Sequence, residues 1–535
     1  MTRPLPLLIA LVACKDGPGP ADTAEVLPAG WSLGPEVTCA SPGAVRFTEQ
    51  GADRGLGEPV EDPFEILGFP MEGRGGSLLA EDLDGDGDID LAVGRVAEAP
   101  LIYANDGAGR FTATPVAAGL GVAEPAVMAM AAADLDGDGL PELVLAGLGF
   151  GAVLPNQGGL RFGNALPLDA QATAGRLCTT MAFGDADGDG WLDLALGCVS
   201  EIREGPHGPD VFPAPDALFL GGPGGLTLSA TLGDEADDTA SRTLALLWSD
   251  LDADGDRDLW ILADDGPRSF LYLNDGAGGL TEGAAAAGLD LRMYAMGVDS
   301  ADLNGDGRPD LCVSDIGPPR CLLSEGTGWV EAGASLGVVP TDWIGEDGTV
   351  GWSVDFADVD NDGWLDLVHA SGPNLDPERT EDYPDLLWRG QADGGFEDAS
   401  AALGFDSPQA SYGMVSADLD GDGQLELVTA GRGAPPRLHA SGCGAGGWLA
   451  VELVGPDGNR DGFGATLVAT VDGVTTRREL HGLRGQGQGP SRFHLGLGDA
   501  ARVEALTLIW PDGVTQEGAW LPGRRTLTAT HPDVP

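Results

Sequence analysis

The sequence predicts an all-β fold: a seven-bladed β-propeller closed by an N-terminal strand and followed by a small C-terminal β domain. An Asp-rich loop occurs seven times, and the loop starts are separated by 52, 51, 65, 52, 56 and 60 residues. Short apolar segments bounded by Asn, Asp and Gly turns follow each loop, which is typical of strands. Four short strands per repeat make one blade of a propeller. No sustained 3.6-residue periodicity appears, so we expect little helix.

The seven loops share one pattern of oxygen-bearing side chains at positions 1, 3, 5 and 9. These residues are Asp82, Asp84, Asp86 and Asp90; Asp134, Asp136, Asp138 and Glu142; Asp185, Asp187, Asp189 and Asp193; Asp250, Asp252, Asp254 and Asp258; Asp302, Asn304, Asp306 and Asp310; Asp358, Asp360, Asp362 and Asp366; and Asp418, Asp420, Asp422 and Glu426. Position 7 would offer its backbone carbonyl, from Asp88, Leu140, Trp191, Asp256, Arg308, Trp364 and Gln424.

This pattern predicts up to seven structural Ca²⁺ sites. Calcium prefers six to eight oxygen ligands, and the first half of the loop repeats the ligand spacing of the EF-hand loop. Glycine at position 6 permits the left-handed backbone that wraps the ion. Magnesium fits less well because it keeps its waters. A site closed by protein ligands leaves no open position for chemistry, so we expect calcium to stiffen the hairpins rather than to catalyse a reaction.

The ends of the repeat array predict how the ring closes. Arg46–Thr48 resembles the aromatic fourth segment of a repeat but precedes the first loop, while the last repeat ends with its third segment at Arg437–His439. We therefore expect the N-terminal strand to complete the last blade, which removes the edge of an open array.

The composition excludes some partners. The chain has 535 residues and a net charge of −57. Nucleic acid is therefore not an expected partner, because phosphate binding needs clustered Lys and Arg. Electrostatic adhesion to an anionic membrane is excluded for the same reason.

The N-terminus predicts export. A short apolar stretch ends in Leu11-Val12-Ala13-Cys14, which resembles a bacterial lipobox. Residues 1–13 would be a lipoprotein signal peptide, Cys14 the lipidated residue and residues 14–40 a flexible tether. The protein would then lie in the cell envelope, at the outer membrane or cell surface, and touch the membrane only through this anchor. An ordinary secretory signal is the alternative, which would give a secreted protein.

The six other cysteines suggest disulfides in an exported chain. Cys178 and Cys198 flank one Asp-rich loop, Cys312 and Cys321 flank a turn, and Cys39 and Cys443 flank the whole repeat array. A Cys39–Cys443 bond would clasp the ends of the ring, but sequence alone does not fix the connectivity, and reduced cysteines stay possible.

Residues from about 45 to 443 resemble FG-GAP/VCBS repeats, the calcium-loop blades of integrin α-subunits and many bacterial surface proteins. The resemblance implies a propeller over residues 41–443 with its metal loops on one face. Two loops depart from the pattern by ending in Glu142 and Glu426, and one carries Asn304.

Residues 444–535 change in character, because no Asp-rich loop follows and arginine becomes more frequent. The segments Gly458–Ala465, His481–Gly485, Phe493–Gly498 and Ile509–Gly513 resemble the ASPIC/UnbV domain, which follows such propellers in cartilage acidic protein and its bacterial relatives. Alternating apolar residues predict a small β domain here.

These features favour a calcium-dependent binding or adhesion module whose partner is an extracellular protein or glycan, and we expect a monomer. The second hypothesis is an enzyme, such as a carbohydrate-active one, whose channel site could include Trp343, Asp347, Trp352 and His369. The third is a purely structural envelope component. No Gly-x-Ser-x-Gly, Walker or His-Glu-x-x-His motif occurs, so we expect no catalytic residues.

Overall fold

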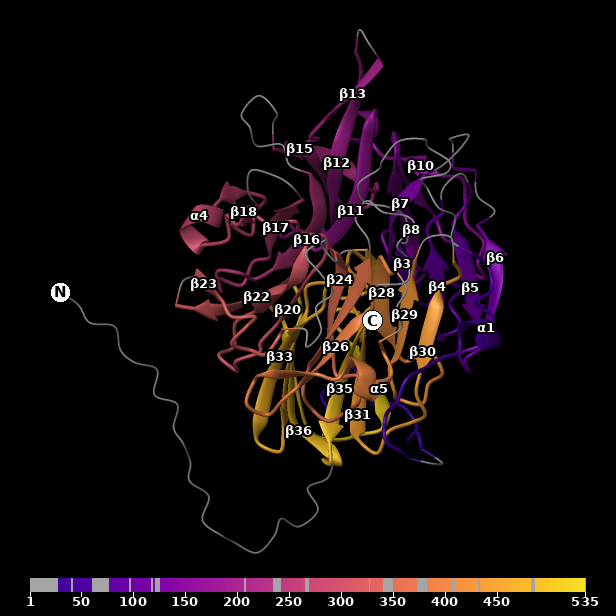
Figure 1. The fold of residues 1–535 in the computed structure, drawn as a ribbon, viewed down its shortest axis with the longest axis vertical. Coiled ribbons are helices and arrows are strands. Elements are labelled where there is room, and N and C mark those ends of the chain that lie inside the picture. Colours follow the sequence, from indigo (N-terminus) through magenta and orange to yellow (C-terminus); the bar gives the residue numbers. More distant parts are fainter. Residues whose placement is uncertain are drawn as a thin grey trace, which may run out of the picture.

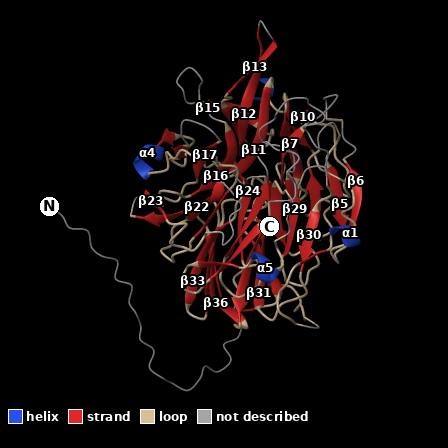
Figure 2. Ribbon diagram, in the orientation of Figure 1, coloured by secondary structure: helices blue, strands red, loops and turns tan. Residues whose placement is uncertain are grey.

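The computed structural model describes residues 27–534, apart from residues 40–41, 60–76, 96–97, 117–118, 121–125, 206–207, 234–241, 265–268, 327, 340–349, 373–382, 407–409, 432–433 and 483–485. Strands dominate this part of the chain (Figure 2). Its helices are single turns, namely α1 (Gly51–Arg54), α3 (Ala170–Thr173), α4 (Ala284–Ala287) and α5 (Ser400–Leu403). The predicted all-β class is confirmed.

Within the described residues, seven sheets each hold one Asp-rich loop between their first two strands. From the first strand outward, the sheets contain β3 (Leu78–Glu81), β4 (Asp90–Val93), β5 (Leu101–Asn105) and β6 (Phe111–Pro115); β7 (Val127–Ala133), β8 (Glu142–Gly147), β9 (Phe150–Leu154) and β10 (Leu166–Pro167); β11 (Arg176–Gly184), β12 (Asp193–Gly205), β14 (Asp216–Leu220) and β15 (Thr227–Leu232); β16 (Thr243–Ser249), β17 (Asp258–Ala263), β18 (Phe270–Leu273) and β19 (Thr281–Glu282); β20 (Val298–Ala301), β21 (Asp310–Asp315), β22 (Gly317–Glu325) and β23 (Gly328–Glu331); β24 (Val350–Ala357), β25 (Asp366–Gly372), β26 (Leu386–Gly390) and β27 (Phe396–Asp398); and β28 (Gly413–Ala417), β29 (Glu426–Ala430), β30 (Arg437–Ala440) and β2 (Thr48–Glu49).

The sheets form a closed ring. The first strand of each sheet contacts the first strands of its two neighbours, in the order β3, β7, β11, β16, β20, β24 and β28, and β28 contacts β3 again. Apolar cores fill the spaces between consecutive sheets; the one that closes the ring packs Leu78 and Leu91 against Val415 and Val428. The first two strands of these sheets are largely apolar, which is expected when both faces of a strand are buried.

The last sheet is completed from the N-terminus, as predicted. Thr48 and Glu49 of β2 pair antiparallel with Ala440 and His439 of β30. The outer edge of this sheet therefore comes from a segment almost 400 residues earlier in the chain.

The C-terminal residues form a two-sheet β domain at one end of the molecule (Figure 1). One sheet contains β31 (Gly447–Val454), β35 (Arg492–Gly498) and β38 (Arg525–Thr530). The other contains β32 (Thr466–Val471), β33 (Val474–Glu479), β36 (Arg502–Ile509) and β37 (Thr515–Pro522). Buried Phe463, Trp510 and Leu527 lie in the core between them.

Part of the expected tether belongs to this domain, which corrects the prediction for residues 14–40. Trp31–Leu33 forms β1, which pairs antiparallel with β38, and Trp31 is buried in the domain core. Burial of the apolar indole and pairing with the edge strand of the sheet favour an ordered strand over a flexible linker. Residues 1–26, with the lipobox and Cys14, lie outside the described residues.

Two further strands extend the sheets of the ring beyond four strands. β34 (Gly487–Gln488) comes from the C-terminal domain and pairs parallel with β3. β13 (Gly208–Phe212) pairs with the end of β12 in a hairpin that projects at the end of the molecule opposite the C-terminal domain (Figure 1).

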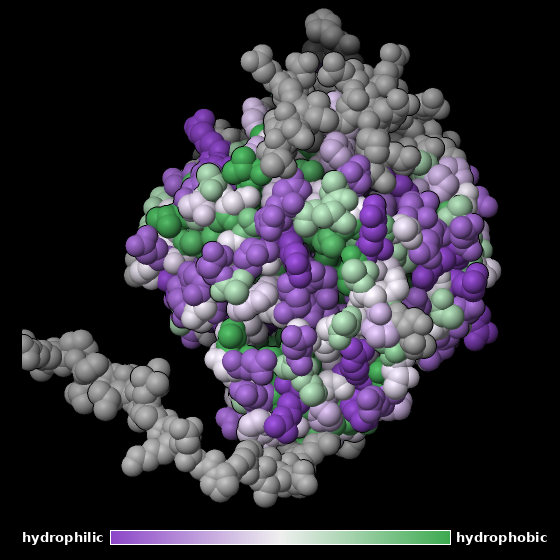
Figure 3. Space-filling view, turned by 60° about the horizontal axis from the view of Figure 1, so that its bottom comes forward, coloured by the Kyte–Doolittle hydropathy of each residue, from purple (hydrophilic) through white to green (hydrophobic). Residues whose placement is uncertain are grey.

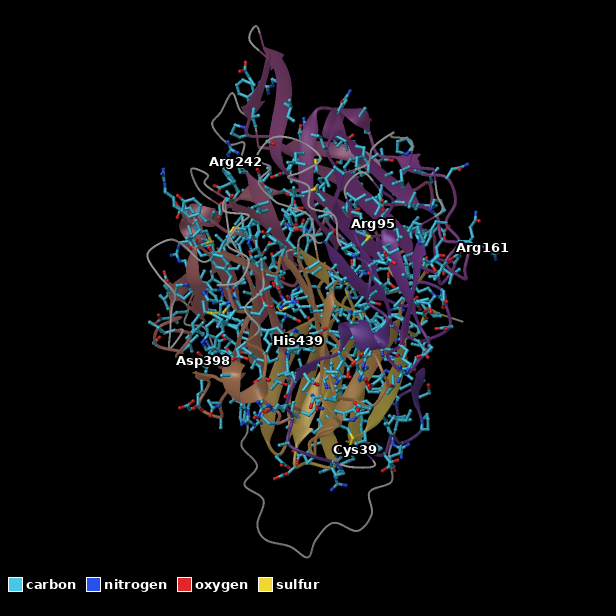
Figure 4. All side chains as sticks on the ribbon, turned by 45° about the vertical axis from the view of Figure 1, so that its right-hand side comes forward. Cys39, Arg95, Arg161, Arg242, Asp398 and His439 are labelled. Carbon is cyan, nitrogen blue, oxygen red and sulfur yellow. A yellow bond between two sulfur atoms is a disulfide. The ribbon has the colours of Figure 1, made fainter. Side chains whose placement is uncertain are left out.

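Three disulfides hold the fold, and their pairing is the predicted one: Cys39–Cys443, Cys178–Cys198 and Cys312–Cys321. The last two link neighbouring strands, whereas Cys39–Cys443 joins residues 404 apart in sequence. Figure 4 shows Cys39 at the C-terminal-domain end of the molecule. No helix in the described residues is long and apolar enough to cross a membrane.

Candidate metal centre

The residue at loop position 9 is the first residue of the second strand in every one of the seven sheets. Asp193, for example, begins β12, and Glu142 begins β8. The Asp-rich loop is therefore the whole connection between the first and second strands, and its closing acid is fixed by sheet pairing. The glutamates at this position fit the same place as the aspartates.

The closing acid holds three parts of the sheet together. In the third loop, Asp193 Oδ2 accepts the N–H of Ala186 over 2.6 Å, and its Oδ1 accepts the N–H of Gly221 over 2.7 Å. Gly221 directly follows β14, the next strand of the sheet. Glu142 makes the corresponding pair of bonds with Leu135 and Asn156, at 2.8 and 3.2 Å. The longer side chain of Glu142 thus keeps the contacts that aspartate makes elsewhere.

The aspartate at position 1 accepts hydrogen bonds from backbone N–H groups later in its own loop. Asp82 Oδ1 accepts the N–H of Gly85 over 2.8 Å, and Oδ2 accepts the N–H of Gly87 over 2.9 Å. Gly85 and Gly87 both have positive φ, at 81° and 97°, which glycine adopts without strain. The turn is therefore built by carboxylate-to-backbone bonds that bring the acids to one point.

Positions 3 and 5 continue this arrangement. Asp84 accepts the N–H of Asp86 over 3.2 Å, and Asp86 accepts the N–H of Asp88 over 3.0 Å. Carboxylate oxygens of Asp82, Asp84 and Asp86 lie within 4.8 Å of one another. Comparable groups are Asp134, Asp136 and Glu142; Asp185, Asp187 and Asp193; Asp250, Asp252 and Asp254; and Asp358, Asp360 and Asp366.

The carboxylates are crowded enough to resist ionisation when no cation is bound. Burial raises the pKa of Asp193 to about 7, and the charges of Asp187 and Asp185 add to the rise. Burial likewise raises the pKa of Asp90 and Asp258 to about 7, and Asp84 and Asp252 respectively contribute repulsion. Like charges at this separation repel in a partly buried site, so a bound cation would relieve an unfavourable arrangement.

The donors fit a hard cation such as Ca²⁺. They are oxygen atoms only, which is the ligand type that calcium prefers. In the sixth and seventh loops, Asp360 Oδ1, Asp418 Oδ1 and Glu426 Oε1 are buried and have no hydrogen-bond partner among the described residues. Buried acceptors of this kind ordinarily have a partner, and a cation would supply one.

Two arginines that were not predicted from the sequence form ion pairs with acids of these loops. Arg389 from β26 forms ion pairs of 2.7 Å with both Asp360 and Asp362 of the sixth loop. Arg54 from α1 lies 3.2 Å from Asp420 of the seventh loop. Arg389 lies two strands further along the same sheet and Arg54 near the other end of the chain, so neither belongs to the loop motif itself.

Two of the four proposed channel residues, Trp352 and His369, are buried side chains of the ring. Trp352 is 2 % exposed and packs on Tyr412 with ring centroids 4.8 Å apart. His369 is fully buried, its Nδ1 lies 3.1 Å from Ser371 Oγ, and burial lowers its pKa to about 3. Both side chains therefore pack within the ring. Trp343 and Asp347 lie outside the described residues.

A surface cleft of about 490 Å³ lies beside the fifth and sixth loops. It is bounded by the sheets of β21 and β25 and by β33 of the C-terminal domain. Trp364 and Leu303 give it apolar surface, while Asn304, Gln391 and Arg478 add polar groups. On the face drawn in Figure 3, patches of apolar residues alternate with hydrophilic ones.

The fold and the loops define a β-propeller protein with repeated acidic hairpin loops. A family model described as "FG-GAP-like repeat" matches residues 82–145 and 250–313, and one described as "ASPIC and UnbV" matches residues 455–535. The chain therefore carries FG-GAP-like repeats followed by an ASPIC/UnbV domain, as the sequence suggested.

Solved structures are similar to this chain at low identity. One is an Agrocybe aegerita lectin that recognises non-reducing terminal N-acetylglucosamine; it has 18% identity, covers 63% of this chain and 84% of that chain, and gives a TM-score of 0.39. The Dos1 propeller has 10% identity, covers 72% and 82%, and gives a TM-score of 0.42. BBS1N in complex with ARL6DN has 12% identity, covers 59% and 94%, and gives 0.28. No curated protein matches the chain.

Proposed function

We propose that this protein is an exported, calcium-loaded propeller that acts as a binding, adhesion or scaffold module. The observation that carries the proposal is the construction of the Asp-rich loops, in which backbone N–H groups hold converging carboxylates at the junction of two strands. Calcium would supply the positive charge that these groups need, held by positions 1, 3, 5 and 9 and the carbonyl of position 7.

The role of the ion is structural. The closing acid already joins the loop to the next strand, so an ion bound to it would stiffen the whole hairpin of a blade. Loops with four carboxylates keep about two negative charges after one Ca²⁺ binds. This leftover charge is consistent with the arginines Arg54 and Arg389 beside the last two loops.

Calcium titration tests this proposal. Isothermal titration of the chelator-stripped protein should give several sites with dissociation constants of about 10⁻⁴–10⁻³ M, the range of extracellular calcium modules. Replacing Asp360 and Asp362 by Asn should remove one site, whereas Asp393→Asn, an exposed acid outside the loops, should remove none. If the wild type and both variants release the same heat on titration with calcium, the assignment is rejected.

The cleft beside Trp364 is the surface where we place the partner, an extracellular protein or glycan. It combines an aromatic side chain with amide and guanidinium groups, a combination that suits polar ligands with apolar faces. Glycan and protein arrays probed with and without calcium test this, with Gln391→Ala as the cleft variant. Binding that persists fully in the variant would place the partner elsewhere.

Anchoring by a lipid on Cys14 completes the proposal. The three disulfides suit an oxidising, extracytoplasmic compartment. In a bacterial host, the wild type should partition into the detergent phase and Cys14→Ser into the aqueous phase. Equal partitioning of the two would leave a secreted protein without a lipid.

A further inference from the structure

The C-terminal domain sits directly on the Asp-rich loops. At the sixth loop, the N–H of Gly498 donates to the carbonyl of Asn361 over 3.0 Å. His494 Nε2 also lies 2.7 Å from Asn361 Oδ1. At the seventh loop, the indole of Trp448 covers Gly423 so closely that a Cβ there would meet it at 1.8 Å. The loop backbone is therefore part of the interface between the domains.

Three further loops make similar contacts. Asp461 Oδ2 accepts the N–H of Asp134 in the second loop over 2.8 Å. The carbonyl of Gly458 accepts the N–H of Leu192 in the third loop over 2.9 Å. In the fourth loop, Arg257 donates to Thr466 Oγ1 over 3.0 Å. These bonds depend on the folded conformation of each loop, because they use backbone atoms or residues within it.

Arginines of the C-terminal domain face the first aspartate of four loops. Arg460 Nε lies 3.9 Å from Asp134 Oδ2, and Arg477 Nη2 lies 4.0 Å from Asp250 Oδ2. Arg478 and Arg492 line an interdomain cavity of about 70 Å³ together with Asp358 and Asp418. Their charges lower the pKa of these two aspartates, against the larger effect of burial, which raises it.

The charges of the two domains differ accordingly. Residues 444–535 carry eight arginines and ten acids, so nearly the whole net charge of −57 lies in the rest of the chain. A loop with four carboxylates keeps a negative charge after binding one Ca²⁺. The arginines are therefore attracted to the loops before and after the ion binds, but less strongly after it. Their charge by itself opposes cation binding, so positive coupling has to come from the contacts with the loop backbone.

We propose that docking of the C-terminal domain and cation binding in the Asp-rich loops are positively coupled. The domain then docks more tightly on the propeller when the loops hold cations. The inference rests on the proposed calcium binding. A bound ion holds the loop backbone in the conformation that Gly498, Gly458 and Asp461 contact, and thereby favours docking. By thermodynamic reciprocity, the docked domain raises the affinity of the same loops for the ion.

Hydrogen exchange on the full-length protein gives the first test. Removing calcium should increase amide exchange in residues 458–464 and 487–498, which contact the loops. Exchange in β36 and β37, which lie in the other sheet of the domain, should change much less. Equal exchange of the contact segments with and without calcium would overturn the coupling.

A pair of variants that leaves the charge unchanged gives the second test. Trp448→Ala, the loop-facing variant, removes the indole that covers Gly423 of the seventh loop. Trp520→Ala, the control, removes an indole that packs against Arg502 in the other sheet. The loop-facing variant should weaken calcium binding at the most affected site by about fivefold or more, as is usual for coupled sites, and the control should not.

The outcomes separate the two proposals. Calcium binding by the wild type with equal affinity in both variants, or tighter binding in the loop-facing variant, would overturn the coupling alone. Absence of calcium binding in the wild type would overturn the proposed function as well. If the loop-facing variant does not fold, the exchange experiment on the wild type still decides the question.

Discussion

The main-chain N–H of Gly221 donates to Oδ1 of Asp193 over 2.7 Å and ties the third Asp-rich loop to the end of β14. The other oxygen of Asp193 accepts the N–H of Ala186, so one buried carboxylate satisfies two backbone donors. The closing acid therefore has a folding role that does not depend on metal.

This relationship predicts different effects for two acids of one loop. Asp193→Ala should lower the free energy of unfolding by about 1–3 kcal/mol even in chelator, because buried donors lose their acceptor. Asp187→Ala, at the less buried position 3, should lower stability mainly when calcium is present. Thermal denaturation of both variants in calcium and in EDTA measures this, and equal losses for the two variants in EDTA would contradict it.

Calcium removal should destabilise the whole ring. At a tenfold excess over the dissociation constant, each site would contribute about 1.4 kcal/mol. Seven sites would approach about 10 kcal/mol, which is comparable to the total stability of a domain. We expect the melting temperature to fall by at least ~10 °C in excess EDTA. An unchanged melting temperature would show that folding and calcium binding are not linked; magnesium added back to the stripped protein is the control for divalent charge.

The pH dependence of stability should carry a contribution from Asp216, a buried acid away from the loops. Burial raises its pKa to about 7, although the N–H of Cys198 and the hydroxyl of Thr243 donate to it and partly offset the effect. The ordinary pKa of this group is 3.8, so the folded state binds the extra proton between about pH 4 and 7. Stability from this group is complete below that window and is lost as the pH rises through it.

Asp216→Asn removes this loss because the amide stays neutral. The variant should therefore gain stability relative to the wild type as the pH rises from about 4 to about 7, by up to about 1.4 kcal/mol per unit. Denaturant unfolding of both proteins at constant calcium checks the sign. A difference between the two proteins that is constant across this range would show that Asp216 ionises normally in the fold.

The Cys39–Cys443 disulfide should contribute more stability than the local ones. It closes a separation of 404 residues, against 9 for Cys312–Cys321, and a longer closed loop restricts the unfolded chain more. Replacing both cysteines of the long pair by serine should cost about 2–5 kcal/mol. The Cys312→Ser, Cys321→Ser variant is the matched comparison, and a larger loss in that variant would contradict the ring-clasp role.

Much of the fold was predictable because its information is local and repeated. Each Asp-rich loop specifies its own turn through carboxylate-to-backbone bonds within nine residues, as Asp82 does with Gly85 and Gly87. Repetition then located the sheets, and the orphan strand near Phe47 indicated where the ring closes. The positions of the cysteines around these repeats suggested the three pairs that the structure contains, without fixing them.

The sequence by itself thus indicated the class of fold, the closing strand and the acids of the Asp-rich loops, but it left the disulfide connectivity open. Only the tertiary structure decided which distant groups meet those acids, namely Arg389 at Asp360, Arg460 at Asp134 and the N–H of Gly221 at Asp193. It also placed Trp31 in the C-terminal domain rather than in a tether. The physical reason is that such contacts join different strands of one sheet, as at Asp193 and Asp360, or different domains, as at Asp134. No spacing within one segment records which partner burial will bring to it.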